Sequence, residues 1–331
     1  MKTIYWIDDD ESRFSSGKNL IEGGISKRTK KANVTPFSAA DRDTFDVLND
    51  VLKSSKPDLI LIDHMLTASK STRLKEGSTF AAALRENWLD VPIVCLTAKR
   101  QGQKKKFGYL KEQQYTAVFD WSQSQEYFDE IHSIADGFAK LKGVKSFKDL
   151  AAKVLKCPKE DQELLISLIK VQALDPTDVG FPHVLTRWLR EYLISLPGLL
   201  IDTLSAATFI GLNQNGFNKI SSSFDSALYT GPFSTTNNPR WWRSAFQQKL
   251  LELVPESESV LPWTLGRKLK GIKKSDFSQC YTSGEDMPEV VAYTDRNKSD
   301  LVPVKIKFTE QDSTKAPILI GFEPYRIIKG Q

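Results

Sequence analysis

Cysteine and histidine are scarce in this sequence, which excludes several classes of protein. The 331 residues include three cysteines and three histidines, namely Cys95, Cys157, Cys280, His64, His132 and His183. The cysteines lie far apart without a CxxC pair, and no histidine has a partner three or four residues away. A disulfide-stapled fold, a zinc ribbon and an HExxH metallohydrolase are therefore excluded.

A long uninterrupted apolar run is also lacking. The most apolar stretch, Leu193–Leu212, is broken by Pro197-Gly198 and carries Asp202 near its middle. Because a charge at the centre of a bilayer costs at least about 2.5–3.5 kcal/mol, we expect a buried helical hairpin and no membrane span. The N-terminus lacks the apolar core of a secretion signal, and the cysteines are unpaired, so we expect a protein of the reducing cytoplasm.

Neither sign of charge dominates the composition. Hydrophobic residues make up 40% and charged residues 26%, with a net charge of +5. These values exclude general disorder and a coiled coil, and they permit a nucleic-acid-binding face without requiring one. The length predicts two or three domains of ~100–200 residues each.

The first half of the chain alternates between short apolar runs and amphipathic segments. The predicted strands are Thr3–Ile7, Asn33–Phe37, Asp58–Asp63, Val91–Leu96 and Tyr115–Phe119. The predicted helices are Ser12–Ile25, Ala40–Ser54, Gly77–Asn87, Lys104–Gln113 and Gln123–Leu141. Such an alternation predicts an α/β fold, namely a doubly wound, five-stranded parallel sheet of the flavodoxin type.

Polar residues stand where the predicted strands end. They are Asp8, Asp9, Asp10, Asp63, Thr97 and Asp120. Ligands of doubly wound sheets bind beyond the carboxyl ends of the strands, so these side chains are the candidates for a site. Carboxylates gathered there would repel one another unless a cation lay among them, and oxygen ligands suit Mg²⁺. Carboxylates at this edge are therefore candidate ligands of Mg²⁺.

Three short motifs at these strand ends occur in one order. They are IDDD at Ile7–Asp10, IDHML at Ile62–Leu66 and LTA at Leu96–Ala98. With these motifs the first 142 residues resemble the receiver domain of two-component response regulators. The resemblance implies that Asp8 and Asp9, with Asp63, hold Mg²⁺. It also implies that Asp63 accepts a phosphoryl group from a sensor histidine kinase and that Thr97 hydrogen-bonds a phosphoryl oxygen.

The sequence departs from the receiver pattern at the fifth strand. Asp120 or Phe119 stands where the family has a lysine, and Ala117 stands at its aromatic switch position. Basic residues elsewhere are candidates to replace the lysine, namely Lys70, Arg73, Lys75 and Lys99. Two interpretations remain open: an active phospho-acceptor, or a pseudo-receiver that keeps the carboxylates but works only as a docking surface.

The second half shows helical patterns followed by strand patterns. Predicted helices cover Phe147–Leu155, Glu160–Ala173, Pro182–Leu196, Pro197–Leu212 and a segment that Pro239 opens. Predicted strands follow at Val290–Tyr293, Val302–Phe308 and Pro317–Phe322. We expect a receiver-like domain over residues 1–142, a mainly helical output region over 143–275 and a small β-rich region over 276–331.

Two basic segments are candidates for contact with nucleic acid or a protein partner. Arg240, Trp241, Trp242 and Arg243 form the first, and the run that ends at Lys273 and Lys274 forms the second. Paired tryptophans between arginines are able to stack on bases. Packing of a tryptophan in the core and a solvated basic run explain the same patterns and are favoured.

The combined prediction is an atypical bacterial response regulator that relays phosphorylation or binding into altered protein–protein contacts, including contact with a second copy of itself. A DNA-binding regulator with a degenerate receiver is one alternative. A receiver-controlled enzyme with a cryptic C-terminal active site is the other, although no catalytic motif is visible there.

Overall fold

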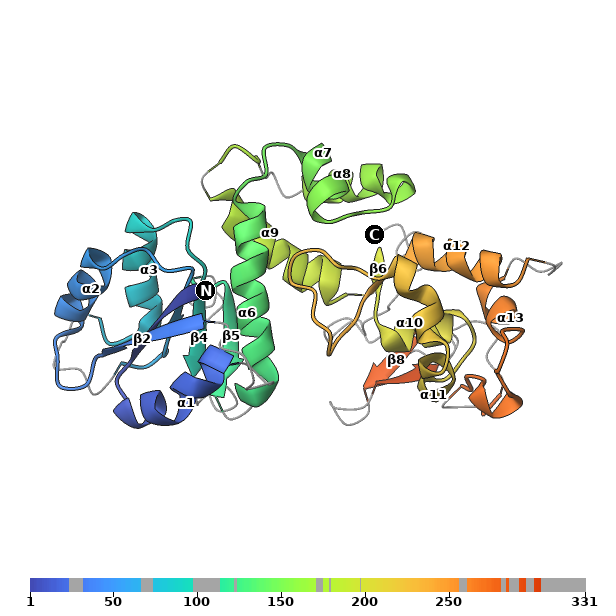
Figure 1. Ribbon diagram of the computed structural model, residues 1–331, viewed down its shortest axis with the longest axis horizontal. Coiled ribbons are helices and arrows are strands. Elements are labelled where there is room, and N and C mark those ends of the chain that lie inside the picture. Colours follow the sequence, from blue (N-terminus) through green and yellow to red (C-terminus); the bar gives the residue numbers. More distant parts are fainter. Residues whose placement is uncertain are drawn as a thin grey trace, which may run out of the picture. The chain divides into compact units, whose positions relative to one another are not determined.

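The computed structural model describes most of the chain, and Figure 1 shows its secondary structure. The described residues are 1–23, 32–66, 74–97, 114–121, 124–170, 175–178, 180–196, 198–255, 261–280, 284–285, 292–295 and 301–304. The chain forms two compact units. The first contains Met1–Leu150, Lys170–Trp188 and Gly231–Thr235, and the second contains the remainder. The domain bounds expected from the sequence stay a prediction.

The first unit is built on a five-stranded parallel sheet with the order β2-β1-β3-β4-β5. The strands are β1 (Lys2–Asp8), β2 (Ala32–Ser38), β3 (Leu59–Ile62), β4 (Ile93–Thr97) and β5 (Ala117–Asp120). Their aliphatic runs are buried on both faces, as in parallel sheets covered by helices. The predicted α/β class and the five-stranded parallel sheet are therefore confirmed, with strand bounds shifted by one or two residues.

Helices cover both faces of this sheet (Figure 1). They are α1 (Glu11–Gly23), α2 (Thr44–Lys53), α3 (Gly77–Asn87) and α6 (Ser124–Leu141). Val47 and Val51 of α2 and Phe80 of α3 pack into one core with Ile60 and Ile62 of β3. The predicted helix Lys104–Gln113 lies outside the described residues.

The N-terminus of α2 shows how local chemistry sets a boundary. Asp43 has extended backbone angles, and its carboxylate accepts a hydrogen bond from the Phe45 N–H at 2.7 Å. The helix therefore begins at Thr44 and not at Ala40, because the cap satisfies an N–H group that lacks a helical partner. Phe45, in the first turn, is 50% exposed.

Later segments complete the first unit. The α9 helix (Phe181–Trp188) contributes His183, whose ring packs edge-on against Phe138 of α6 at 4.8 Å. Gly137 of α6 faces the ring of Phe233. Neither contact is visible in the sequence pattern, since the partners are far apart along the chain.

The second unit is mainly helical. Its elements include α8 (Gln162–Lys170, of which Lys170 belongs to the first unit), α10 (Thr203–Phe209), α11 (Gln214–Asn218), α12 (Arg243–Leu253) and α13 (Pro262–Gly266). Short α7 (Phe147–Asp149) ends the first stretch of the first unit and leads into a π-helix at Leu150–Val154, of which Leu150 still belongs to the first unit. In the second unit another π-helix covers Leu189–Ile194, and 3₁₀ helices cover Lys159–Asp161, Ser221–Ala227 and Lys274–Asp276. Aromatic rings form its core, with Phe224 stacked on Phe246 at 4.1 Å.

Two helices predicted for this unit are wrong in part. Residues of the expected helix Pro197–Leu212 instead form strand β6 (Leu200–Ile201) before α10. Asp202 sets the start of α10 as its N-cap, accepting the Ser205 N–H at 2.6 Å. Pro239 does not open a helix. Strand β7 (Trp241–Trp242) pairs antiparallel with β6, and α12 begins only at Arg243.

A small antiparallel pair lies near the C-terminal end of the described residues. Strands β8 (Ala292–Asp295) and β9 (Leu301–Val304) form it. They confirm two of the three predicted strands, while Pro317–Phe322 lies outside the described residues.

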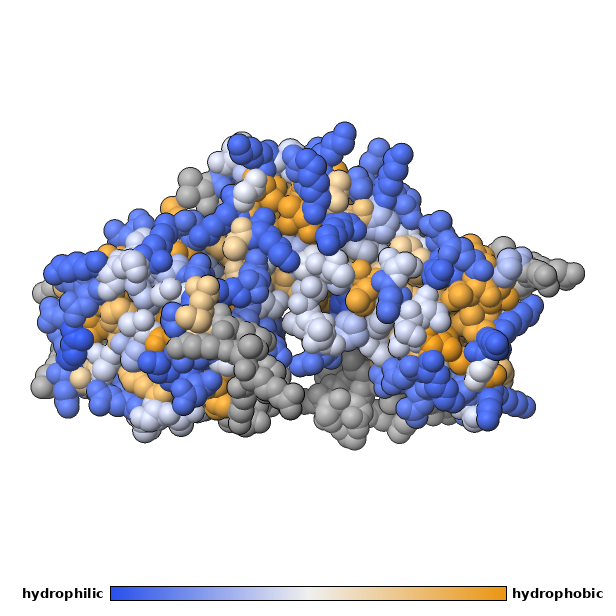
Figure 2. All heavy atoms as spheres, in the orientation of Figure 1, coloured by the Kyte–Doolittle hydropathy of each residue, from blue (hydrophilic) through white to orange (hydrophobic). Residues whose placement is uncertain are grey.

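The described surface is largely hydrophilic on the face shown in Figure 2. Hydrophobic residues gather there over α12 and α13, where Leu251, Leu253 and Leu261 are partly exposed. None of the helices in the described ranges combines the length and the apolar composition that a membrane span requires.

Candidate functional site

Neighbouring strands β1 and β3 bring two separate stretches of sequence to one edge of the sheet. Ile7 pairs with Ile62, and the Asp63 N–H donates to the Ile7 carbonyl oxygen at 3.0 Å. Asp8, the last residue of β1, and Asp63, the residue after β3, therefore leave the sheet side by side. This edge lies where the strand order reverses, which is the usual ligand position of doubly wound sheets.

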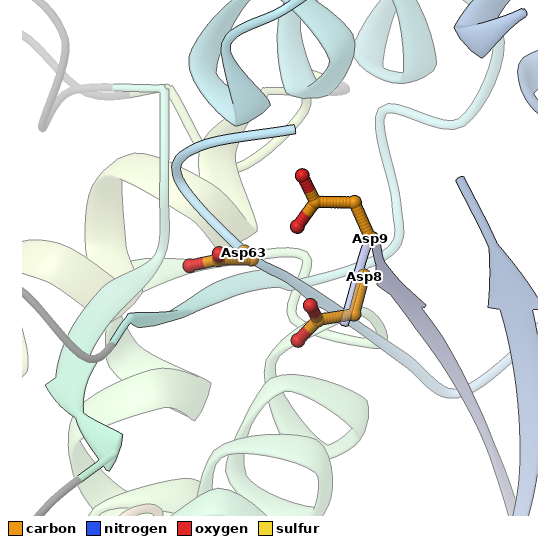
Figure 3. Close-up of side chains that lie close together, drawn as sticks. All are labelled: Asp8, Asp9 and Asp63. Carbon is orange, nitrogen blue, oxygen red and sulfur yellow. The ribbon is translucent and has the colours of Figure 1, made fainter. Parts of the chain in front are cut away.

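Three carboxylates converge at this edge (Figure 3). Asp8, Asp9 and Asp63 each offer an oxygen, and these oxygens lie within 4.8 Å of one another. Asp8 and Asp63 are buried, whereas Asp9 is partly exposed. The structure thus brings together the three residues that the sequence suggested as metal ligands.

Backbone and hydroxyl donors orient the two buried carboxylates. Asp8 Oδ1 accepts the Asp10 N–H at 2.9 Å, and Asp63 Oδ1 accepts the His64 N–H at 2.8 Å. The Thr97 side chain, at the end of β4, also hydrogen-bonds Asp63. Donors fixed in this way hold a carboxylate in one orientation, so the donors need not move when the carboxylate reacts.

Arg13 completes the site and was not singled out in the sequence. Its Nη1 lies 3.2 Å from Asp8 Oδ2 and 3.1 Å from Asp63 Oδ2, and its Nε lies 3.5 Å from Asp10 Oδ2. Asp10 starts α1 by accepting the Ser12 N–H at 3.0 Å. Helical side chains point back toward the helix N-terminus, so an arginine in this first turn is directed at the end of β1. Its position five residues after Asp8 is the signal that could have identified it.

Burial and mutual repulsion change the ionisation of the cluster. Burial, with the nearby Asp63 charge, raises the pKa of Asp8 to about 7. Burial also raises the pKa of Asp63, although Arg13, the His64 N–H and Thr97 oppose that shift. Although burial disfavours its charge, Arg13 has a raised pKa because Asp8 and Asp63 favour the guanidinium cation.

These residues fit a magnesium ion. Carboxylate oxygens are the ligands that Mg²⁺ prefers, and a few protein oxygens with room for water suffice for it. Asp8 and Asp63 place two buried carboxylates beside one cation, Arg13, and a divalent cation would offset the remaining negative charge.

Asp120 is the last residue of β5, and it or Phe119 stands at the position that holds a lysine in the receiver pattern. Asp120 is buried and pairs in register with Thr97. Of the four basic residues considered as replacements, Lys75 is described and is exposed. Lys70, Arg73 and Lys99 lie outside the described residues. The cation that contacts Asp63 in the described part of the chain is Arg13.

A second group of buried side chains supports the residue after the acceptor. His64 Nδ1 lies 3.3 Å from the Tyr115 hydroxyl, and the His64 carbonyl accepts the Gly77 N–H at 2.7 Å. Burial raises the pKa of Tyr115 well above its usual range, so the hydroxyl stays protonated and available as a donor. Packing alone placed these residues beside Asp63, and the sequence offered no spacing signal for them.

The candidate residues from the second half of the chain belong to the second unit, whereas the acidic cluster belongs to the first. Trp241 and Trp242 are buried in β7, where Trp241 packs against Phe217 at 5.3 Å and Trp242 against Tyr229 at 5.6 Å. The favoured interpretation of the tryptophans as packing residues agrees with this placement.

The basic candidates of the second unit differ in exposure. Arg240 donates through Nε to the Ile194 carbonyl at 2.8 Å, and burial lowers its pKa. The Arg243 guanidinium lies 5.2 Å from the centre of the Phe209 ring. Lys273 and Lys274 are exposed. Of these four basic residues, the two lysines are exposed and the two arginines are partly buried.

Replacing Trp241 by alanine is expected to destabilise the second unit by about 3–5 kcal/mol, because a buried indole is removed from an aromatic core. Urea unfolding followed by hydrogen exchange of residues 199–255 measures the loss. Tyr192→Ala, which truncates an aromatic that is 53% exposed, should change stability by less than about 0.5 kcal/mol. Equal effects of the two changes would show that Trp241 does not support the core.

Solved structures are similar to the first part of the chain. No protein-family model matches the sequence, and no curated protein matches it. The N-terminal part is structurally similar to receiver domains of response regulators. The similarity is one of fold, at 14–17% identity.

Three solved structures illustrate it. A LuxR-family DNA-binding response regulator from Staphylococcus aureus matches at 14% identity, with a TM-score of 0.31, over 41% of this chain and 99% of its own. A receiver domain from Bacteroides fragilis matches at 17% identity and a TM-score of 0.31 over 40% and 95%. The response regulator TrrA from Thermotoga maritima, solved with Mg²⁺ and BeF, matches at 16% identity and a TM-score of 0.29 over 40% and 99%.

Proposed function

We propose that the first unit is a Mg²⁺-dependent phospho-acceptor domain of a signalling protein, with Asp63 as the acceptor. The observation that supports this proposal is the convergence of Asp8, Asp9 and Asp63 within 4.8 Å at the ends of neighbouring parallel strands. Thr97, hydrogen-bonded to Asp63, adds a hydroxyl donor at the same point. Together these groups supply a nucleophile, a cation site and a donor.

The reaction is a phosphoryl transfer. A carboxylate oxygen of Asp63 forms a bond to phosphorus while the bond from phosphorus to the donor breaks, leaving imidazole when the donor is a phosphohistidine. Asp8 and Asp9, with Asp63, would hold Mg²⁺, which supplies positive charge for the transferred oxygens. The His64 N–H orients the acceptor. Thr97 donates to the acceptor now and to a phosphoryl oxygen afterwards.

The output is proposed to be a change in protein–protein contact. A sensor histidine kinase is the expected donor, and a second copy of this chain or another signalling protein is the expected partner. Binding of a group at Asp63 favours one arrangement of the surrounding strand ends, and a partner that binds this arrangement more tightly is recruited. We expect the protein to act in the cytoplasm.

Intact-mass analysis after incubation with acetyl phosphate and Mg²⁺ tests the proposal. The wild type should gain the mass of one phosphoryl group, and Asp63→Asn should gain none. Asp50→Asn, which removes a surface carboxylate that is about half exposed, should behave as the wild type. An unmodified wild type would instead indicate a pseudo-receiver, and a phosphorylated Asp63→Asn would move the acceptor elsewhere.

A further inference from the structure

Arg13 lies where a cation bound by the acidic cluster would have to lie. Its Nη1 is within 3.2 Å of Asp8 Oδ2 and within 3.1 Å of Asp63 Oδ2, so one nitrogen bridges both carboxylates. The arginine side chain is 17% exposed, and the two aspartate side chains are 1% and 6% exposed. The contact is therefore a largely desolvated one and not a loose surface pair.

The remaining oxygens of the two buried carboxylates are already engaged. Asp8 Oδ1 accepts the Asp10 N–H, and Asp63 Oδ1 accepts the His64 N–H. The Oδ2 atoms are consequently the ones best placed to ligate a metal, and Arg13 donates to both of them. Magnesium lies about 2.1 Å from its ligands, so it cannot share these two oxygens with a guanidinium at hydrogen-bond distance without strong repulsion.

We propose that Arg13 is a built-in competitor of Mg²⁺, which holds the Asp8 and Asp63 carboxylates together until the metal displaces it. This inference rests on the metal site of the proposed function. It adds that Arg13 sets the Mg²⁺ concentration at which the site becomes occupied. It also gives the cluster a counter-charge.

The structure provides a position for the displaced guanidinium. Arg13 Nε lies 3.5 Å from Asp10 Oδ2, and the Asp10 side chain is 47% exposed. Rotation of the arginine side chain over Asp10 moves its charge toward solvent while keeping one ionic partner. Exchange between the two positions therefore needs no rearrangement of α1.

The test compares Mg²⁺ affinity in the full-length wild type and in Arg13→Gln by isothermal titration calorimetry. Because two charge-assisted hydrogen bonds no longer compete, Arg13→Gln should bind Mg²⁺ about tenfold or more tightly. Arg42→Gln, which removes a cation from an exposed pair with Asp50, controls for net charge and should stay within about twofold of the wild type. Asp8→Asn combined with Arg13→Gln should abolish the gain.

Arg13→Lys is the second variant, since lysine keeps the charge but lacks the Nε group that contacts Asp10, and its ammonium is more strongly hydrated than a guanidinium. Its affinity should lie between those of the wild type and Arg13→Gln, and it serves alone if Arg13→Gln fails to fold. Unchanged or weaker Mg²⁺ binding in the Arg13 variants overturns the competition.

Phosphoryl uptake separates this inference from the proposed function. A wild type that takes up phosphoryl while the Arg13 variants bind Mg²⁺ no more tightly overturns the competition and leaves the phospho-acceptor standing. Tighter Mg²⁺ binding by Arg13→Gln, with no uptake by either protein, supports the competition and rejects the phospho-acceptor.

Discussion

Gly77→Ala is expected to destabilise the first unit by about 3 kcal/mol or more. A methyl group at this position would lie 2.0 Å from the Asp63 carbonyl oxygen and 3.0 Å from the Tyr115 hydroxyl. The obstructing atom is backbone that β3 and β1 hold in place, so neither neighbour is able to move aside cheaply. Gly77 is required here for close approach of α3 to the acceptor strand.

Thermal and urea unfolding of the variant measure the loss, and Mg²⁺ titration reports whether the end of β3 has shifted. Gly143→Ala is the matched control, because a methyl group there meets nothing within 4 Å. That change should leave stability the same or raise it by about 0.4–1 kcal/mol through the unfolded chain. Full stability of Gly77→Ala would show that α3 does not pack on Asp63 as described.

The second large effect is a loss of stability with rising pH in the absence of metal. The pKa of Asp8 is about 7 in the folded protein and 3.8 as its ordinary value. Between pH 3.8 and pH 7, Asp8 is therefore protonated in the folded state and ionised in the unfolded state. Stability from this group is fully present below pH 3.8 and is lost as the pH rises through 7, at about 1.4 kcal/mol per pH unit.

Asp8→Asn isolates that contribution, because every other group still titrates. Between pH 5 and pH 8 the unfolding free energy of the wild type should fall by roughly 3 kcal/mol relative to the variant. Added Mg²⁺ should restore the wild type chiefly at pH 8, where the carboxylates are charged, and should leave Asp8→Asn nearly unchanged. Parallel pH profiles of the two proteins without metal would contradict the raised pKa of Asp8.

Much of the first unit was predictable because its signals are local. The unbroken aliphatic run at Leu59–Ile62 identified a strand covered on both faces, and acidic residues at the ends of such runs identified one edge of the sheet. The prediction of α3 at Gly77–Asn87 agrees with the structure residue by residue. Parallel strands bring their carboxyl ends together, so a local pattern was enough to foresee the acidic cluster.

The second unit was less predictable because long-range pairing overrode local pattern. Apolar residues around Leu200 suit a helix or a strand equally well, and pairing with Trp241–Trp242 decided for the strand. Pro239 is a common first residue of a helix, yet α12 begins after β7 ends. Neither outcome depends on residues within one turn of the segment concerned.

By itself the sequence determined the alternation of strand and helix, the edge at which Asp8, Asp9 and Asp63 gather, and the oxygen-rich character of that edge. Tertiary structure alone decided that Arg13 bridges Asp8 and Asp63. It also decided that Gly77 must be small and that both tryptophans of the pair, where the sequence favoured one, are buried. The reason is physical: hydrophobic periodicity is written within a few neighbouring residues, whereas a side-chain contact across 50 residues exists only once the elements pack.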